Sequence, residues 1–423
     1  MSLLPYWSVS MSVAQLPERT SSADAQPKRD RKSTQSATQT VRQSGDVWIE
    51  FAEQLEDIRQ HRLDWGDLGQ HVAEANVFQT WWMLLAVWEQ LPPDERPRVA
   101  FIYEQPSPIT ESPLLIGVFP LVKRRGCYGL PITVWQLWTH RLLFLNTPLV
   151  RAGHEIPALS ALFDWLKESR SATAIELQGI PGERAMSQAL IHLLDSTERT
   201  SFAVNRYCRA FIRRRGTYDD YLDSLPGHTR REFGRLRRQL ERMGQLEVRS
   251  LNSGDDVEPW IDQFLELESR GWKGRGQTAL KTSGEDEQIF RHITREAGKR
   301  DQLDMLGLFL DGQPIALKCN FLMGRGAYAF KIAYDEKYSK QSPGVQLELE
   351  NIRRLLESER TDWMDSCAVA RHSMIDRLWK ERRVIETRLV SSGRFGSDAL
   401  LAMYPVLRAA KRELGRLLPQ AKN

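Results

Sequence analysis

A segment of helix followed by strand occurs twice in this chain, and it limits the possible fold more than any other sequence feature. The two copies are residues 156–179, IPALSALFDWLKESRSATAIELQG, and residues 342–367, SPGVQLELENIRRLLESERTDWMDSC. Each has a proline near the helix start, apolar residues at helical spacing, a short polar break and a strand. Repetition of such a segment predicts two similar units in tandem. The expected fold class is therefore α/β, of the α+β kind with mixed sheets.

The chain length and a polar N-terminal segment set the expected domain boundaries. At 423 residues the chain is about right for two domains. Residues 17–45 are rich in Ser, Thr and Gln and nearly free of large apolar side chains, so they cannot offset the entropy cost of ordering. We expect a disordered tail over 1–45, an N-terminal unit over 46–205 and a C-terminal catalytic unit over 206–423. The first helix is expected over 47–60.

Charge and cysteine content exclude several classes of function. The formal net charge is only +4, so no overall field favours nucleic acid, and DNA is not an expected partner. No apolar run reaches the length of a membrane span, and the start of the chain makes a poor signal peptide, so we expect a cytoplasmic protein. The cysteines lie far apart with no CxxC spacing, which disfavours disulfides and a zinc site. They are Cys127, Cys208, Cys319 and Cys367.

The second copy of the repeat starts its helix with a residue that weakens helices. Ser342 is a good N-cap and Pro343 suits the first helical position, but Gly344 costs up to about 1 kcal/mol relative to Ala. The first copy has Ala158 at the corresponding place. A helix N-terminus attracts anions, and a residue without Cβ lets a phosphate come close to the backbone. Gly344 therefore predicts either close packing or a pyrophosphate site, and the chain contains neither a P-loop nor a GxGxxG motif.

The order of segments around this glycine resembles the core of the GNAT acyltransferases. Two strand hairpins lie in residues 306–335, then SPG opens a helix, and TDWMDSC provides the next strand. Enzymes of that family bind the pyrophosphate of acyl-CoA at this helix start through a Q/R-x-x-G-x-G/A motif. The resemblance implies that acetyl-CoA or another acyl-CoA is the co-substrate and that no metal takes part. The residues at the implied cofactor site are Gln341, Ser342, Gly344, Val345 and Gln346, of which Gln346 replaces the last Gly/Ala.

Three further stretches resemble one bacterial subgroup. They are residues 271–280, GWKGRGQTAL, residues 330–338, FKIAYDEKY, and residues 365–383, DSCAVARHSMIDRLWKERR. The subgroup comprises the CelD-like acetyltransferases of cellulose and exopolysaccharide synthesis, which are tandem GNAT units related to the Fem aminoacyl ligases. The resemblance implies acyl transfer, chiefly N-acetyl transfer, to a small-molecule or glycan precursor of the cell envelope. Association with envelope-synthesis proteins is implied as well.

Two alternative functions stay open from the sequence. Residues 228–244, HTRREFGRLRRQLERMG, predict a helix with one apolar stripe and six arginines over the rest of its surface. In an aminoacyl-tRNA-dependent, Fem-like ligase these arginines would carry tRNA. In the simpler interpretation they form a solvated face. The other alternative is a non-catalytic scaffold in exopolysaccharide assembly.

Acyl transfer from a thioester asks little of side chains, so the catalytic candidates are few. A backbone N–H on a splayed strand, expected within residues 325–335, would polarise the carbonyl, while a base and an acid move protons. The candidates for base or acid are Tyr334, Asp335, His372 and Glu268. Simpler roles are a core aromatic for Tyr334, a loop cap for Asp335 and a position just before a capped helix for His372.

Strand register predicts a pair of lysines at the substrate. MGRG, residues 323–326, suits a two-residue hairpin turn, and the resulting register places Lys318 opposite Lys331 on a face lined by small residues. Like charges directly opposite are destabilising unless an anion neutralises them. We therefore predict that Lys318 and Lys331 bind substrate. The alternatives are that a carboxylate such as Glu266, Glu268 or Asp365 folds over them, or that both side chains extend to water.

Overall fold

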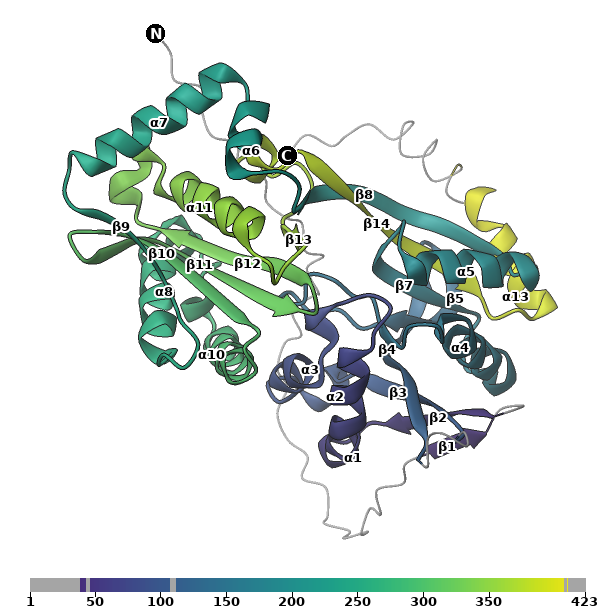
Figure 1. The fold of residues 1–423 in the computed structure, drawn as a ribbon. Coiled ribbons are helices and arrows are strands. Elements are labelled where there is room, and N and C mark those ends of the chain that lie inside the picture. The colour runs from purple at the N-terminus through teal and green to yellow at the C-terminus, as the bar shows by residue number, and fades with distance from the viewer. Residues whose placement is uncertain (1–38, 43–45, 107–111, 407–408, 410–423) are drawn as a thin grey trace, which may run out of the picture. The chain divides into compact units, whose positions relative to one another are not determined.

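Two stretches of the chain have the same order of secondary-structure elements (Figure 1). The computed structural model describes residues 39–42, 46–106, 112–406 and 409. In the N-terminal repeat, residues 47–213, a strand is followed by helices, three antiparallel strands, a helix, a strand, a helix and a last strand. Its elements are β2 (Val47–Ala52), α1 (Leu55–Gln60), α2 (Arg62–Gln70), η1 (Val77–Gln79), α3 (Trp81–Trp88), η2 (Pro93–Glu95), β3 (Arg98–Glu104), β4 (Leu114–Cys127), β5 (Leu130–Leu137), β6 (Leu149–Val150), α4 (Glu155–Ser169), β7 (Ala174–Pro181), α5 (Ala185–Ser196) and β8 (Ser201–Arg213).

The C-terminal repeat, residues 246–391, follows the same order. Its elements are β9 (Leu246–Ser250), α8 (Glu258–Arg270), α9 (Trp272–Arg275), η3 (Leu280–Thr282), α10 (Gly284–Lys299), β10 (Leu303–Leu310), β11 (Gln313–Met323), β12 (Gly326–Tyr334), η4 (Glu336–Gln341), α11 (Pro343–Glu357), β13 (Trp363–Asp365), α12 (Ile375–Leu378) and β14 (Glu381–Ser391). The elements outside the repeats are β1 (Gln39–Arg42), α6 (Tyr218–Ser224), α7 (Gly227–Glu241) and α13 (Phe395–Ala402). The shared order confirms the prediction of two similar α/β units in tandem.

The last strands of the two repeats are exchanged within one mixed sheet. Over the described ranges, the strand order is β1–β2–β3–β4–β5–β7–β14–β8–β13–β12–β11–β10–β9, with β6 paired to β4. β8, the last strand of the N-terminal repeat, pairs with β13 of the other repeat, while β14 pairs with β7. β8 and β14 also pair with each other. The boundary expected between residues 205 and 206 falls inside β8, and the described residues belong to one compact unit.

The start of the described chain differs from the sequence expectation in two places. Gln39–Arg42 lies within the tail expected to be disordered, yet it forms β1, antiparallel to β2. Residues 1–38 and 43–45 lie outside the described residues. Residues 47–52, expected to begin a helix, form β2 instead, and α1 begins at Leu55. The β-branched and aromatic residues of β2 favour a strand once β3 offers it a paired edge.

Helices cover both faces of the C-terminal strands (Figure 1). α11 and α7 lie on one face, where Leu347 of α11 packs with Ala316 of β11. α8 and α10 cover the other face, where Phe264 and Phe290 belong to the same buried cluster as Phe330 of β12. We call these the α11 face and the α8 face. β12 is therefore buried between two helical layers.

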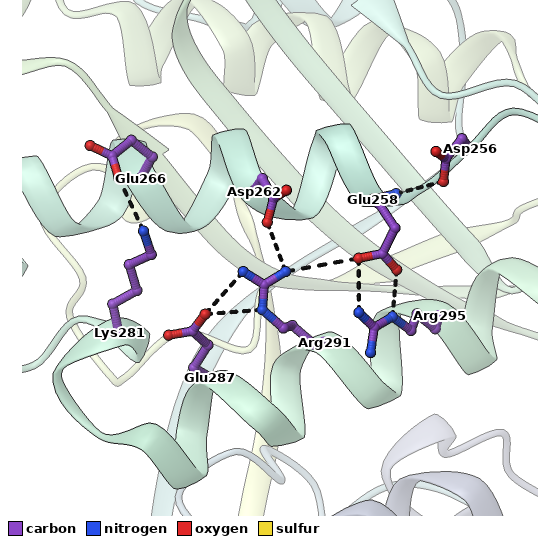
Figure 2. A network of polar contacts seen from close by, with 8 residues as sticks. All are labelled: Asp256, Glu258, Asp262, Glu266, Lys281, Glu287, Arg291 and Arg295. Carbon is purple, nitrogen blue, oxygen red and sulfur yellow. Dashed lines mark hydrogen bonds and ion pairs between the residues drawn. The ribbon is translucent and has the colours of Figure 1, made fainter.

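Ion pairs join α8 to α10 (Figure 2). Arg291 of α10 lies 2.7 Å from Asp262 of α8, and Arg295 lies 2.8 Å from Glu258. These side chains are partly exposed, so each pair contributes little stability by itself. Together they orient α8, which carries Glu268 on its buried side.

Candidate active site

β12 has a sheet partner along all of one edge but along only part of the other. It pairs with β11 over residues 326–334, whereas it pairs with β13 only over residues 326–328. In the part of the chain that the structure describes, no strand pairs with residues 329–334 on the β13 side. We call this stretch the open edge of β12. The absence of a neighbouring strand on this side is in line with the splayed strand expected within residues 325–335.

A β-bulge interrupts β12 at the start of the open edge. The register against β11 shifts by one residue between Tyr328 and Lys331, so that Ala329 and Phe330 together oppose Asn320. An extra residue on one strand moves every following side chain to the other face. The side chains beyond the bulge therefore have the opposite orientation from the one expected by simple alternation.

Because of this bulge, the predicted pairing of the two lysines is wrong. Lys318 lies opposite Ile332 instead of Lys331. The two ammonium groups also contact different helices. Lys318 lies 2.7 Å from Glu348 of α11, and Lys331 lies 3.7 Å from Glu268 of α8. The alternative, in which a carboxylate covers each lysine, is what the structure contains.

Lys318 and Glu348 form a buried ion pair on the α11 face. Their side chains are only 2% and 0% exposed. Asn351 and Trp379 donate hydrogen bonds to the other oxygen of Glu348, at 2.9 and 3.1 Å. Buried charges persist when they are paired and hydrogen-bonded in this way. This burial argues against contact between Lys318 and a substrate.

Charged side chains from both repeats meet on the α8 face beside the open edge. Glu268 is buried, accepts a hydrogen bond from the backbone N–H of Leu280 at 2.9 Å, and lies next to Lys331. Asp286, in the first turn of α10, lies 2.8 Å from Arg141, which follows β5. Burial raises the pKa of Asp286, and Arg141 and Lys331 oppose that rise. Two carboxylates and two cations are therefore grouped here, and we call them the α8-face cluster.

The segment that carries Arg141 is anchored in the core. Trp138 and Leu142 are buried, and the ring nitrogen Nδ1 of His140 accepts the backbone N–H of Leu142 at 3.3 Å. Burial lowers the pKa of His140 to about 4, and the neighbouring Arg141 adds to the effect. Sequence reasoning missed Arg141 and Asp286, because no local pattern connects a loop of one repeat to a helix of the other.

Gly344 packs against the end of β12. It is buried, and a Cβ at this position would lie 3.3 Å from Cδ1 of Tyr334 and 3.9 Å from Cδ1 of Ile332. The shorter of these separations is tighter than the optimum for carbon atoms. Close packing, one of the two interpretations of Gly344, therefore accounts for the missing side chain.

The first turn of α11 uses some of its own backbone donors. Ser342 adopts a left-handed φ of 51°, and its carbonyl accepts the N–H groups of Val345 and Gln346 at 3.0 and 3.1 Å. The side chain of Gln346 is buried and donates to the carbonyl of Phe233 in α7 at 3.0 Å. Gln341 ends η4 just before this turn. The assignment of acyl-CoA binding to these residues stays a prediction.

Asp335 and His372 both have capping roles in the structure. Asp335 accepts the backbone N–H of Lys337 at 2.9 Å and so caps η4. His372 itself caps α12, because its Nδ1 accepts the backbone N–H of Ile375 at 3.3 Å. Tyr334 is half-buried beside α11. These contacts match the simpler roles, and a catalytic role for any of the three stays a prediction.

A buried carboxylate marks the point where β13 stops pairing with β12. Asp365 is the ladder partner of Tyr328 and lies 2.8 Å from Nε of Arg209 and 2.6 Å from Nη1 of Arg383. The two arginines lie directly opposite each other across β8 and β14. Burial by itself would raise the pKa of Asp365, but the two guanidinium groups outweigh it and lower the pKa. This cluster holds the end of the ladder in place and so fixes where the open edge begins.

Two further properties hold for the described residues. They include no group of three or more His, Cys, Asp and Glu side chains that could hold a metal ion. They also include no helix that is both long and apolar enough to cross a membrane.

Several solved structures resemble this fold at low sequence identity. FemX has 11% identity over 79% of this chain and 95% of its own, with a TM-score of 0.49. A conserved protein of unknown function from Bacteroides thetaiotaomicron VPI-5482 has 11% identity over 81% and 99%, with a TM-score of 0.48. A tandem GNAT protein from the clavulanic acid biosynthesis pathway has 13% identity over 82% and 99%, with a TM-score of 0.39. No function is carried over from likenesses at this level, and no curated protein matches the chain.

The sequence of the C-terminal half matches a known domain family. Residues 227–370 match the Acetyltransferase (GNAT) domain. The matched region contains α8, the open edge of β12 and the start of α11, which together make up the candidate site. This match confirms the enzyme class predicted from the sequence, a GNAT-type acyltransferase.

Proposed function

We propose that the protein transfers an acyl group from acyl-CoA to an amine or hydroxyl of a cell-envelope or polysaccharide precursor. The observation that carries this proposal is the open edge of β12, which has the start of α11 on one face and the α8-face cluster on the other. Donor and acceptor can then approach the same backbone stretch from different sides. The resemblance to CelD-like acetyltransferases supports the choice of acceptor class.

The donor binds on the α11 face. The pantetheine arm of acyl-CoA would take the place of a strand beside residues 329–334, where backbone N–H groups can hydrogen-bond the thioester carbonyl. The pyrophosphate would lie at the start of α11, beside residues 341–346. Exposed Lys337 and Lys340 of η4 precede that helix and suit the phosphate charges.

The reaction forms one C–N or C–O bond and breaks the C–S bond of the thioester. Attack by the acceptor places negative charge on the carbonyl oxygen, which the N–H groups of the open edge stabilise. Glu268 takes the proton from the acceptor, and Tyr334 gives a proton to the leaving thiolate. Lys331 orients Glu268 and contacts the acceptor. Asp335 and His372 are the alternative bases.

Calorimetry with CoA and acetyl-CoA tests the donor. Micromolar binding of both is the expected result. A protein that binds neither, but that is retained on tRNA at low salt, would be an aminoacyl-tRNA-dependent ligase instead. A protein that binds none of the three would be a scaffold.

The role of Glu268 is tested by Glu268→Gln, with Glu266→Gln as the matched control on the exposed side of the same helix. Loss of a general base lowers kcat by about 100-fold or more, and acetyl-CoA affinity should not change. The control variant should keep the wild-type kcat. If Glu268→Gln keeps both the rate and the pH profile, the base lies elsewhere, and Asp335→Asn and His372→Gln become the decisive variants.

A further inference from the structure

One face of α7 carries a row of exposed arginines. They follow one another at spacings of four, three and four residues, which places them on a single stripe of the helix. At the rise of an α-helix, the stripe is roughly 16 Å long. The opposite side of α7 is buried through Phe233, Leu236 and Leu240. The arginines of the row are Arg231, Arg235, Arg238 and Arg242.

Among the described residues, no acidic side chain pairs with the row. Other arginines of α7 have acidic partners: Arg230 contacts Asp223, and Arg237 lies 2.6 Å from Glu350. Over the described ranges, by contrast, no carboxylate forms an ion pair with the four arginines of the row. Cations three and four residues apart on one helix repel each other. The row therefore weakens α7 unless an anionic partner covers it.

The row lies beside the donor end of the candidate site. Leu240 of α7 packs in the same cluster as Tyr334 and Tyr338. The carbonyl of Phe233 accepts a hydrogen bond from Gln346 in the first turn of α11. α7 is thus on the α11 face, which is the side from which the proposed donor enters (Figure 1).

The residue types of the row indicate what kind of partner fits. Phe233, the one Phe, Tyr or Trp residue of α7, is buried, and the ring of His228 contacts the hydroxyl of Thr229 at 3.2 Å. The row therefore offers no large aromatic ring on which nucleotide bases could stack. The row is also entirely cationic, whereas a membrane-binding helix exposes an apolar face as well. Cations with helical spacing complement acidic side chains that repeat with the same spacing on a facing helix.

We propose that this row docks an acidic helical carrier protein, which delivers the acyl group as a phosphopantetheine thioester to the open edge of β12. The inference rests on the proposed thioester donor, because acyl-CoA and an acyl carrier protein present the same arm. A row of four cations along several helical turns matches a protein surface, whereas the phosphates of one CoA molecule gather at a single point.

The test is direct binding of a bacterial acyl carrier protein in its apo form, which lacks the arm and so reports on the surface alone. The row variant reverses the charge of all four arginines (Arg231→Glu, Arg235→Glu, Arg238→Glu, Arg242→Glu). The control reverses four exposed arginines outside α7 and therefore has the same net charge (Arg62→Glu, Arg124→Glu, Arg125→Glu, Arg206→Glu). We expect wild type and control to bind, and the row variant to lose at least about 30-fold in affinity, because complementary charge is removed. Binding should also weaken with added salt.

Calorimetry with acetyl-CoA on the same three proteins separates the other outcomes. The row variant should keep its acetyl-CoA affinity; a parallel loss would mean that the row holds the phosphates of CoA, which overturns the inference. Absence of carrier binding by the wild type, or retention on tRNA in its place, also overturns it. If the carrier protein binds but neither acyl-CoA nor the acylated carrier supports acyl transfer, the proposed function is rejected while the docking surface is still supported.

Discussion

The two repeats use the same elements but end their central strand pairs differently. In the N-terminal repeat, β5 pairs with β7 at residues 134–136 and ends one residue later. In the C-terminal repeat, β12 pairs with β13 at its first three residues and then runs on for the six residues of the open edge. The second arrangement leaves a long strand edge beyond the end of the ladder, which a ligand can join. The difference teaches that the point where a single ladder stops decides how much of a central strand edge is left without a neighbouring strand.

The buried acid at the end of each ladder shows the same contrast. Glu176 of β7 is paired with Gln136 and accepts hydrogen bonds from neutral side chains, among them Gln178 at 2.9 Å. Asp365 of β13, at the corresponding place, instead accepts from two arginines. One of these arginines comes from β8, the exchanged strand of the other repeat. The end of the C-terminal ladder is therefore held by buried ion pairs, and the end of the N-terminal ladder by hydrogen bonds from neutral side chains.

The largest expected effect comes from neutralising these two acids in turn. Asp365→Asn leaves two buried guanidinium groups facing each other, so we expect unfolding free energy to fall by about 3–5 kcal/mol. Glu176→Gln disturbs only neutral hydrogen bonds and should cost about 1–2 kcal/mol. Urea denaturation of both variants measures the difference. Equal losses would show that the two ladder ends are held by the same kind of interaction.

The second effect concerns a charge that only the C-terminal repeat buries. Counting from the prolines of α4 and α11, Glu348 corresponds to Leu162, which is fully buried. Lys318→Met leaves the buried carboxylate of Glu348 without its ammonium partner, so the unfolding free energy should fall by about 3 kcal/mol. The double variant with Glu348→Leu, which has the residue type of the N-terminal repeat at this position, should recover most of that loss. The urea denaturation midpoints of the single and double variants measure the loss and the recovery. A double variant less stable than the single one would show that the ion pair is needed in its own right.

The third effect is pH dependence from the loop after β5, a part of the N-terminal repeat that reaches the α8-face cluster. The folded pKa of His140 is about 4, below its ordinary value of 6.5. Between these two values the unfolded chain binds more protons, so stability falls as the pH drops through the window. The His140 contribution is up to about 3 kcal/mol. Denaturation at pH 7.5 and pH 5 should therefore show a steeper loss for the wild type than for His140→Gln. An equal loss of stability between pH 7.5 and pH 5 in the two proteins would mean that this histidine is not held in its neutral form.

The smallest effect comes from exchanging the residues that first set the two copies apart. Gly344→Ala would gain helix propensity, but its Cβ meets the ring of Tyr334, and we expect a net loss of about 1 kcal/mol. Ala158→Gly, the reverse change in α4, should lose at least a similar amount, through helix propensity and through the loss of a buried methyl group. Thermal denaturation measures both. A more stable Gly344→Ala protein would refute the packing explanation, and its acetyl-CoA affinity would then test the phosphate explanation directly.

Local patterns predicted a good part of this structure. The two copies at 156–179 and 342–367 are α4 with β7 and α11 with β13. The two-residue turn at 324–325 is present, since Met323 pairs with Gly326. The same register failed a few residues further on, because the bulge in β12 depends on how its side chains pack against helices on both faces. Alternation along one strand contains no information about that packing.

By itself the sequence determined the repeat, the start of α11 at Pro343 and the hairpin turn, because helical spacing, proline and turn residues act over a few positions of the chain. Only the tertiary structure decided which side chains meet. Arg209 and Arg383 converge on Asp365 because the last strands of the repeats are exchanged. Arg141 reaches Asp286 because a loop of one repeat packs on a helix of the other. Such contacts join residues far apart in the sequence, and they are selected by which strand edges pair and which faces are buried, so no local pattern records them.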